Sequence, residues 1–259
     1  MKAVILAGGA GTRLSELTHL IPKPMAEIGG KPILWHIMKT YSHYGIKDFI
    51  ICCGYKQYII KEYFVNYFIH NCDLTVHLAD NSFDVQDNHS EDWHVTMVDT
   101  GLNTFTGGRI ARIRKYVGNE RFLLTYGDGV SDVDISRTIE EHEKSGALLS
   151  VMAYQPTGKF GALDIGSDGK VNAFSEKPED SGAWINAGYF VCEPGIFDYI
   201  KNGDAEIFER TPLENIARDG KMHAFRHTGF WKPMDTMRDN HELNEMWASG
   251  HAPWKCWKD

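Results

Sequence analysis

The chain lacks the features of membrane-embedded and nucleic-acid-binding proteins. It contains no apolar run of membrane-spanning length. Its 27 Lys and Arg residues are outnumbered by 35 Asp and Glu residues, and no local basic patch offsets the net charge of −8. We therefore expect neither a nucleic acid nor a membrane as a partner. The first residues read as a strand rather than as a signal peptide, so we expect a cytoplasmic protein.

Cysteine is also scarce, and its arrangement suits neither disulfides nor zinc. The five cysteines form no Cys-x-x-Cys pair, and an odd number does not suit a disulfide framework. Reduced thiols are expected in such a chain. A zinc site at His223 and His227 is disfavoured. Residues 222–225 alternate like a strand, which would place these histidines at over twice their helical distance.

Apolar strands and amphipathic helices alternate through the first part of the chain. The strands are expected at residues 2–7, 48–53, 74–78, 94–98 and 122–126. The helices are expected at residues 32–44, 57–68, 109–117 and 134–144, with an exposed polar loop at 80–93. This repetition predicts an α/β fold with a Rossmann-like, doubly wound and mostly parallel sheet.

The pattern becomes strand-rich beyond residue 146. Strands are expected at residues 148–153, 162–165, 171–174 and 188–191, and helices at 208–218 and 237–247. Ile165 and Val171 flank a Ser-Asp-Gly turn in the manner of a hairpin. Because no linker or repeat interrupts the chain, we predict one domain over residues 1–259.

A glycine-rich loop follows the first strand. Residues 4–13 read Val-Ile-Leu-Ala-Gly-Gly-Ala-Gly-Thr-Arg. Glycines let backbone N–H groups surround phosphate oxygens, and Arg13 can add a bidentate cation. Glycine also serves many strand-to-helix turns for steric reasons alone. The segment has neither the Gly-Lys-Ser/Thr of a P-loop nor the G-x-G-x-x-G spacing of dinucleotide sites.

A lysine between two prolines lies shortly after this loop. Pro22 and Pro24 disfavour a helix and hold Lys23 in an extended segment. Lys23 is a candidate second cation for a polyphosphate. The alternative is an ordinary solvated lysine.

These two motifs and several later ones, in this order, resemble the signature of the sugar-1-phosphate nucleotidyltransferases. The later matches are Tyr-Gly-Asp-Gly at 126–129, Phe-Gly at 160–161, Glu-Lys-Pro at 176–178, Asn-Ala-Gly at 186–188 and Gly-Phe-Trp-Lys-Pro-Met-Asp-Thr at 229–236. One departure is Leu-Ser-Glu at residues 14–16, where many members carry Arg-Leu-x-Pro.

The resemblance is closest to members that use CTP and glucose 1-phosphate as substrates, and it implies CDP-glucose and pyrophosphate as products. It implies Mg²⁺ as cofactor, a homo-oligomer, and a supply of deoxyhexoses for lipopolysaccharide O-antigen. Residues 1–145 would bind the nucleotide and residues 146–259 the sugar. A UDP- or dTDP-glucose pyrophosphorylase, or a glycosyltransferase that uses nucleotide sugars, remains an alternative.

The position of Asp128 after a buried strand suits a metal ligand, because α/β sheets bind their ligands at the carboxyl ends of strands. Asp235 is the proposed second carboxylate, and the resemblance favours this pair for the metal. Asp132 and Asp134 are better read as turn or capping residues. The resemblance makes Arg13, Lys23 and Asp128 the catalytic residues.

The remaining candidates contact the substrates by resemblance. The nucleotide would meet Leu6, Ala7, Gly8, Gly9, Ala10, Gly11, Thr12, Arg13, Lys23, Thr104, Arg109 and Gly127. The sugar phosphate would meet Gly161, Glu176, Lys177, Asn186, Gly188 and Trp231.

Three of these sequence features have a second interpretation. Thr104 and Thr106 suit helix capping as well as nucleotide contact. Trp231 suits plain core packing as well as the sugar ring. The aromatic end at residues 252–257 suits an assembly contact or a tail docked on its own core.

Overall fold

The computed structural model describes residues 1–156, 162–165, 171–175 and 183–258, with backbone only in the two short ranges and at positions 13 and 15. Its centre is a seven-stranded sheet with strand order β14-β10-β13-β8-β1-β4-β7. These strands are β1 (Lys2–Leu6), β4 (Asp48–Cys53), β7 (His94–Asp99), β8 (Phe122–Tyr126), β10 (Leu149–Tyr154), β13 (Ile185–Cys192) and β14 (Met222–His227). Every pairing is parallel except the two that β13 makes. The predicted mostly parallel α/β sheet is confirmed.

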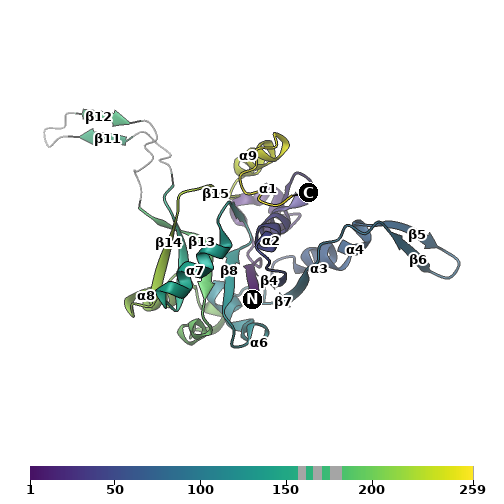
Figure 1. Ribbon diagram of the computed structural model, residues 1–259, viewed down its shortest axis with the longest axis horizontal. Helices are drawn as coiled ribbons and strands as arrows, with labels where there is room; N and C mark the ends of the chain where they lie inside the picture. The colour runs from purple at the N-terminus through teal and green to yellow at the C-terminus, as the bar shows by residue number, and fades with distance from the viewer. Residues whose placement is uncertain (157–161, 166–170, 176–182, 259) are drawn as a thin grey trace.

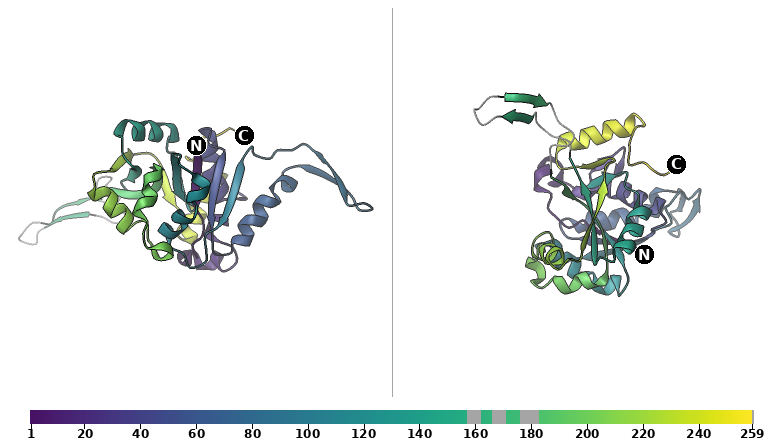
Figure 2. Two further views of the ribbon diagram at one scale, coloured as in Figure 1. Left: turned by 90° about the horizontal axis from the view of Figure 1, so that it is seen from below. Right: turned by 60° about the vertical axis from the view of Figure 1, so that its left-hand side comes forward.

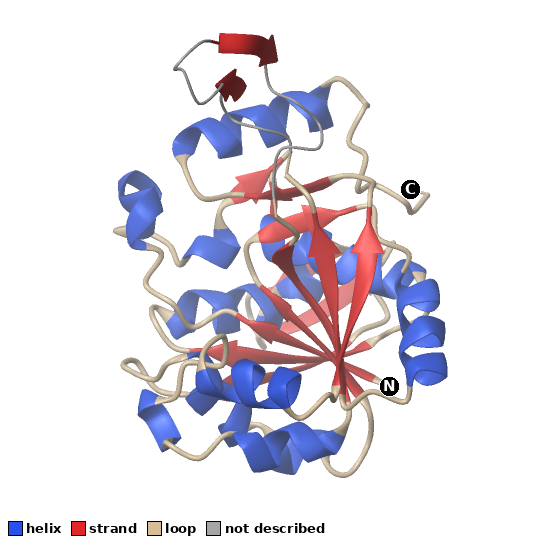
Figure 3. Ribbon diagram, turned by 90° about the vertical axis from the view of Figure 1, so that its left-hand side faces the viewer, coloured by secondary structure: helices blue, strands red, loops and turns tan. Residues whose placement is uncertain are grey.

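Helices cover both faces of this sheet (Figure 3). They are α1 (Ser15–Thr18), α2 (Ile33–His43), α3 (Gln57–Val65), α4 (Tyr67–His70), α5 (Thr106–Arg112), α6 (Arg114–Val117), α7 (Ile135–Ser145), α8 (Thr211–Arg218) and α9 (Met237–Ala248). Strand β1 shows why two layers are needed. Its alternate residues enter different hydrophobic cores, with Ala3 and Ile5 in one, Val4 and Leu6 in the other. Burial on both faces explains the unbroken apolar run in the sequence.

Among the described residues, four short antiparallel strand pairs lie outside the central sheet. They are β2 (Glu27–Ile28) with β3 (Lys31–Pro32), β5 (Asp73–His77) with β6 (Ser82–Gln86), β9 (Gly129–Ser131) with β15 (Trp231–Pro233), and β11 (Ala162–Ile165) with β12 (Val171–Ser175). The predicted pairing of Ile165 with Val171 is confirmed.

The exposed loop predicted for residues 80–93 is wrong in part, because β6 pairs with β5. This hairpin projects away from the body of the molecule (Figures 1 and 2). Its side chains are largely exposed, and Leu78 is 90 % exposed. Strand β5 corresponds to the strand predicted at 74–78, whereas β6 was not predicted, because polar residues predominate in 80–93.

Three predicted helices have different bounds. The helix predicted at 208–218 begins only at Thr211 as α8. The helix predicted at 57–68 is divided into α3 and α4, and the one predicted to begin at Arg109 begins at Thr106 as α5. Gly107 and Gly108 disfavour helix, but they allow close packing here. A Cβ at Gly107 would lie 2.7 Å from Cγ of Glu206, and one at Gly108 would lie 2.8 Å from Cα of Asp204. Tertiary packing thus outweighs local propensity.

The aromatic C-terminal segment is docked on the chain's own core. Trp254 is fully buried, and its Nε1 donates to Nδ1 of His36 at 3.3 Å. The indole stacks on Phe230 and Trp247. Trp254 is therefore part of the core within one chain. Among the described residues, no helix combines the length and the apolar character needed to cross a bilayer.

Candidate active site

A cavity of about 540 Å³ opens beside the carboxyl ends of β1 and β8. Its wall contains most of the residues predicted from the glycine loop and the later motifs. These are Leu6, Ala7, Gly8, Gly9, Gly11, Thr12, Lys23, Thr104, Arg109, Gly127, Asp128, Asn186, Trp231 and Asp235. The structure therefore brings together residues that are up to 229 positions apart in sequence, on segments from both halves of the chain.

Some predicted residues are not in this wall. Ala10 and Gly188 are not among the described residues that line the cavity. Gly161, Glu176 and Lys177 lie outside the described residues, as does the side chain of Arg13. The backbone of Arg13 belongs to the short 3-10 helix η1 (Thr12–Leu14), which begins next to the loop.

Arg109 fastens the glycine loop to the neighbouring strands. Its guanidinium donates to the carbonyl oxygens of Gly8, Cys53 and Gly101 at 2.9, 3.2 and 2.8 Å. It also donates to Oγ1 of Thr100 at 2.7 Å. The side chain is only 4 % exposed, and burial lowers the pKa of this guanidinium. A Cβ on Gly8 would lie 2.1 Å from Nη1 of Arg109, so glycine is required there.

This cation is held by neutral oxygens. No described carboxylate lies within ion-pair distance of the Arg109 guanidinium. Asp99 attracts this charge from beyond ion-pair distance, so the guanidinium at the base of the glycine loop is not neutralised by direct contact with a described carboxylate. Such a charge favours an anion in the adjoining space.

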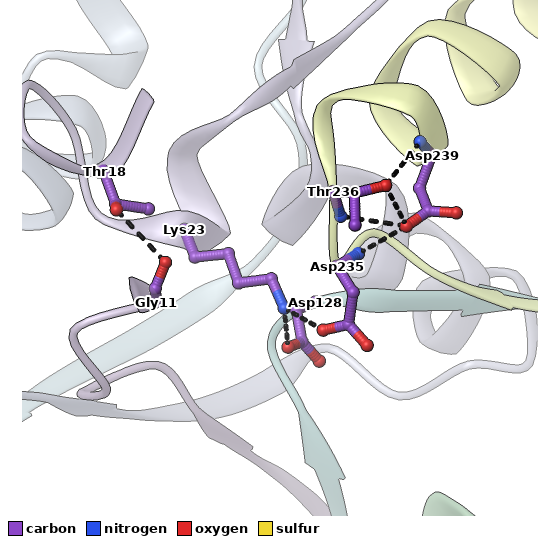
Figure 4. A network of polar contacts seen from close by, with 7 residues as sticks. All are labelled: Gly11, Thr18, Lys23, Asp128, Asp235, Thr236 and Asp239. Atoms are coloured by element: carbon purple, nitrogen blue, oxygen red, sulfur yellow. Dashed lines mark hydrogen bonds and ion pairs between the residues drawn. The ribbon is translucent and has the colours of Figure 1, made fainter. Parts of the chain in front are cut away.

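Lys23 lies between the two predicted metal carboxylates. Its Nζ is 2.7 Å from Oδ2 of Asp128 and 2.7 Å from Oδ1 of Asp235 (Figure 4). Lys23 is only 7 % exposed, which excludes the ordinary solvated lysine. Two carboxylates and one ammonium carry a formal charge of −1 together. Their oxygens converge on one point, as the ligands of a divalent cation must.

A short strand pair explains how Asp128 and Asp235 meet. In the pairing of β9 with β15, Gly129 lies opposite Pro233. The N–H of Met234 also donates to the carbonyl oxygen of Asp128 at 2.8 Å. Asp128 is therefore one residue from Gly129, and Asp235 is two residues from Pro233, in the strand pair that holds them together. Strands of three residues are too short to be predicted from a periodic pattern.

Asp239 fixes the backbone on the other side of Asp235. Its Oδ2 accepts from the N–H groups of Asp235 and Thr236, at 3.1 and 2.9 Å (Figure 4). The Thr236 side chain in turn accepts from the N–H of Asp239, which completes a capping box at the start of α9. The carboxylate that caps α9 therefore also holds the backbone of Asp235 in place.

Asp134 has the capping role predicted for it, whereas Asp132 is bound to neighbouring groups and is neither a turn nor a capping residue. Asp134 is the N-cap of α7, where its Oδ1 accepts from the N–H of Arg137 at 2.9 Å. Asp132 accepts from the N–H of Phe230 at 2.7 Å and pairs with His227 at 3.0 Å. Strand β14 confirms that His223 and His227 belong to a strand.

Asn186 and Trp231 also line the cavity. Nε1 of Trp231 is buried and has no hydrogen-bond partner among the described groups. An unpaired buried donor at a cavity wall can be satisfied by a ligand oxygen. Gly188 serves another purpose. It has a φ of +81°, and a Cβ there would lie 2.2 Å from Cδ2 of Tyr126.

Sequence reasoning missed five described residues of the cavity wall: Pro24, Phe105, Tyr126, Ala187 and Pro233. Each of these residues is next to a predicted residue in the sequence or belongs to the same motif. Their position beside predicted residues could therefore have identified them. Thr106 is not a helix cap. The N-cap of α5 is Phe105, and no side chain caps it. Thr104 is buried in the same wall, which favours the contact interpretation.

Comparison with known proteins agrees with this geometry. The family described as nucleotidyl transferase matches residues 2–249. The chain is 57 % identical to a glucose-1-phosphate cytidylyltransferase of Salmonella typhimurium over 259 residues, which is all of both chains. It is 45 % identical to a probable glucose-1-phosphate cytidylyltransferase of Bacillus subtilis over 257 residues, 99 % of this chain and 100 % of the relative.

A solved structure supports the same assignment. HddC from Yersinia pseudotuberculosis superposes with a TM-score of 0.68 at 26 % identity, covering 95 % of this chain and 99 % of that one. Together with the glycine loop, the buried lysine and the paired aspartates, these similarities show that the chain belongs to the nucleotidyl transferase family.

Proposed function

We propose that this protein transfers a cytidylyl group from CTP to α-D-glucose 1-phosphate, giving CDP-glucose and pyrophosphate. One observation carries the chemistry: a single cavity joins a glycine loop, two buried cations and two converging carboxylates. The full-length 57 % identity to a glucose-1-phosphate cytidylyltransferase supports the choice of substrates.

The reaction is in-line attack by a phosphate oxygen of glucose 1-phosphate on the α-phosphorus of CTP. That oxygen is already ionised at neutral pH, so no side chain has to remove a proton. Catalysis then depends on alignment and on neutralising the charge around phosphorus. The glycine loop offers its N–H groups to the triphosphate. We assign Arg13 to the β- and γ-phosphates, and Lys23 to the α-phosphate or the departing pyrophosphate.

Asp128 and Asp235 would hold Mg²⁺. Their oxygens already converge on one cationic group, the ammonium of Lys23. Carboxylate oxygens are the ligands that Mg²⁺ prefers, and two of them are a usual protein contribution. When bound there, the ion supplies positive charge to the phosphate oxygens around the reacting phosphorus.

We assign the sugar to the C-terminal part, residues 146–259. Asn186 and Trp231 are its described contacts, and the indole N–H of Trp231 is a donor for a hydroxyl oxygen. Glu176 and Lys177 are proposed to bind the sugar hydroxyls and phosphate, with Gly161 leaving room for the ring. Gly188 would act through Tyr126, whose ring it accommodates.

Release of pyrophosphate tests the proposal. Purified protein would be supplied with glucose 1-phosphate, Mg²⁺ and each of CTP, UTP, dTTP, ATP and GTP in turn. We expect CTP to give the highest kcat/KM. A preference for UTP or dTTP would establish the related pyrophosphorylase instead. Transfer from a finished nucleotide sugar to an acceptor, without pyrophosphate release, would establish a glycosyltransferase.

The proposal also includes the oligomeric state of the protein and its location in the cell. The β5–β6 hairpin carries Val76, Leu78 and Phe83 exposed on an arm beyond the body (Figure 1). Exposed apolar groups on such an arm suit contact with another copy of the chain, so we propose a homo-oligomer. All five cysteines are free thiols, which suits the cytoplasm. The product would supply deoxyhexoses for lipopolysaccharide O-antigen.

A further inference from the structure

One carboxylate behind the cavity wall binds two of the hydroxyl groups that line the cavity. Glu209 lies just before α8 and is not among the described lining residues. Its Oε1 accepts from Oη of Tyr126 at 2.6 Å, and its Oε2 accepts from Oγ1 of Thr106 at 2.6 Å. Both donors line the cavity. Charge-assisted bonds of this length are among the strong hydrogen bonds of proteins.

Both hydroxyls are held in place by further contacts. The Tyr126 ring fits against Gly188, where a Cβ would overlap it, and meets Phe190 edge-on at 6.1 Å between centroids. Oγ1 of Thr106 also accepts from the N–H of Phe208 at 2.9 Å. Neither group can therefore turn without breaking a packed arrangement.

The proton positions follow from this geometry. A hydroxyl has one proton to donate, and a carboxylate can only accept. The protons of Tyr126 and Thr106 both point to Glu209, so each of these two hydroxyl oxygens offers only lone pairs to its other neighbours. One such neighbour of the Tyr126 oxygen is the side-chain amide of Asn186, which also lines the cavity. Burial, and then the charge of Glu209, raise the pKa of Tyr126 well above its usual value, which keeps the phenol protonated.

We propose that Glu209 is a specificity-determining residue, because it makes the hydroxyl groups of Tyr126 and Thr106 act as hydrogen-bond acceptors towards the cavity. A ligand group that donates a hydrogen bond is accepted there. A carbonyl or phosphate oxygen would meet two oxygens without protons and a carboxylate behind them. The inference rests on the proposed function, whose substrates carry two kinds of donor: the exocyclic amine of cytosine and the hydroxyls of glucose. Uracil presents a carbonyl oxygen where cytosine presents that amine.

Glu209→Gln tests the inference while keeping the size of the side chain. The amide has one accepting oxygen and one donating nitrogen, so one of the two hydroxyls must turn its proton towards the cavity. Glu214→Gln is the matched control, because Glu214 is exposed on α8. Selectivity would be measured as ratios of kcat/KM within one enzyme preparation. The fraction of folded protein cancels in such ratios.

Two ratios distinguish the two donors. If the base amine meets this wall, the CTP/UTP ratio of Glu209→Gln falls by about 10-fold, and Glu214→Gln leaves it unchanged. If a sugar hydroxyl meets it, the ratio of glucose 1-phosphate to one of its 2-, 3-, 4- or 6-deoxy analogues falls by about as much. Either result supports the inference.

The opposite result is equally clear. If both ratios stay within about 2-fold of wild type while activity falls, Glu209 has only a structural role and the inference is overturned. Failure of the proposed function would look different. Wild-type protein would then prefer another nucleotide, and the effect of Glu209→Gln on selectivity would still be measured with that nucleotide.

Discussion

Two buried cations lie beside the same cavity, and their partners have opposite character. Arg109 is surrounded by carbonyl and hydroxyl oxygens, whereas Lys23 lies between Asp128 and Asp235. Arg109 forms no ion pair with a described carboxylate, whereas Lys23 forms ion pairs with two. The Arg109 side suits a triphosphate and the Lys23 side a divalent cation. The proposed reaction needs both a triphosphate site and a metal site, and these two sides of the cavity would supply them.

Asp128→Ala should produce the largest effect, because it removes half of the carboxylate pair. We expect kcat to fall at least ~100-fold with the fold retained, as for the loss of one group that stabilises the transition state. Pyrophosphate release and circular dichroism measure the two quantities. Asp134→Ala is the control, since it removes a helix cap worth about 1 kcal/mol and leaves turnover unchanged. Near-normal turnover in folded Asp128→Ala would contradict the mechanism.

Arg109→Ala should mainly lower stability. The carbonyl oxygens of Gly8, Cys53 and Gly101 would lose a buried donor, and we expect the free energy of unfolding to fall by about 3 kcal/mol or more. Urea denaturation measures this loss. Arg112→Ala is the control, because its ion pair with Asp204 is exposed and should be worth less than about 1 kcal/mol. If both variants lose the same free energy of unfolding, Arg109 does not stabilise the fold by holding the glycine loop to the neighbouring strands.

His36 should make stability depend on pH. Burial lowers its pKa to about 4, while the unfolded value is 6.5. The unfolded chain therefore binds a proton between these values and the folded chain does not. Stability is complete above pH 6.5 and should fall by about 3 kcal/mol towards pH 4. Urea denaturation of wild type and His36→Gln over this pH range measures the contribution of His36 as the difference between their free energies of unfolding. If that difference does not change with pH, the prediction is wrong.

Leu78→Ser should have the smallest effect on the fold. The side chain is 90 % exposed, so the free energy of unfolding should change by no more than about 0.5 kcal/mol. Sedimentation of the same variant tests assembly separately. A smaller mass than wild type would support the arm as a contact between copies, and an unchanged oligomer would show that Leu78 is not needed for it.

The sequence predicted the Arg109 side of the molecule better than the Lys23 side. Parallel strands buried on both faces carry long apolar runs, and β1, β4 and β8 were predicted within one residue of their bounds. A strand end followed by glycines also locates a ligand site at the edge of the sheet. The role of Arg109 as a clamp was not predictable, since it depends on carbonyl oxygens that any residue supplies.

The meeting of Asp128 with Asp235 depends on β9 and β15, which have three residues each. Strands this short give no periodic signal, so the sequence offered the pair only through resemblance. Glu209 was missed for a similar reason. Its neighbours show no motif, and its importance comes from two hydroxyls that are over 80 positions away.

A crystal of the protein with CTP and Mn²⁺, examined by anomalous scattering, tests the proposed positions of the metal and the triphosphate most directly. We predict a manganese peak bound by Asp128 and Asp235, with the triphosphate against residues 8–13. A metal peak elsewhere, or a triphosphate bound away from the glycine loop, would contradict the account.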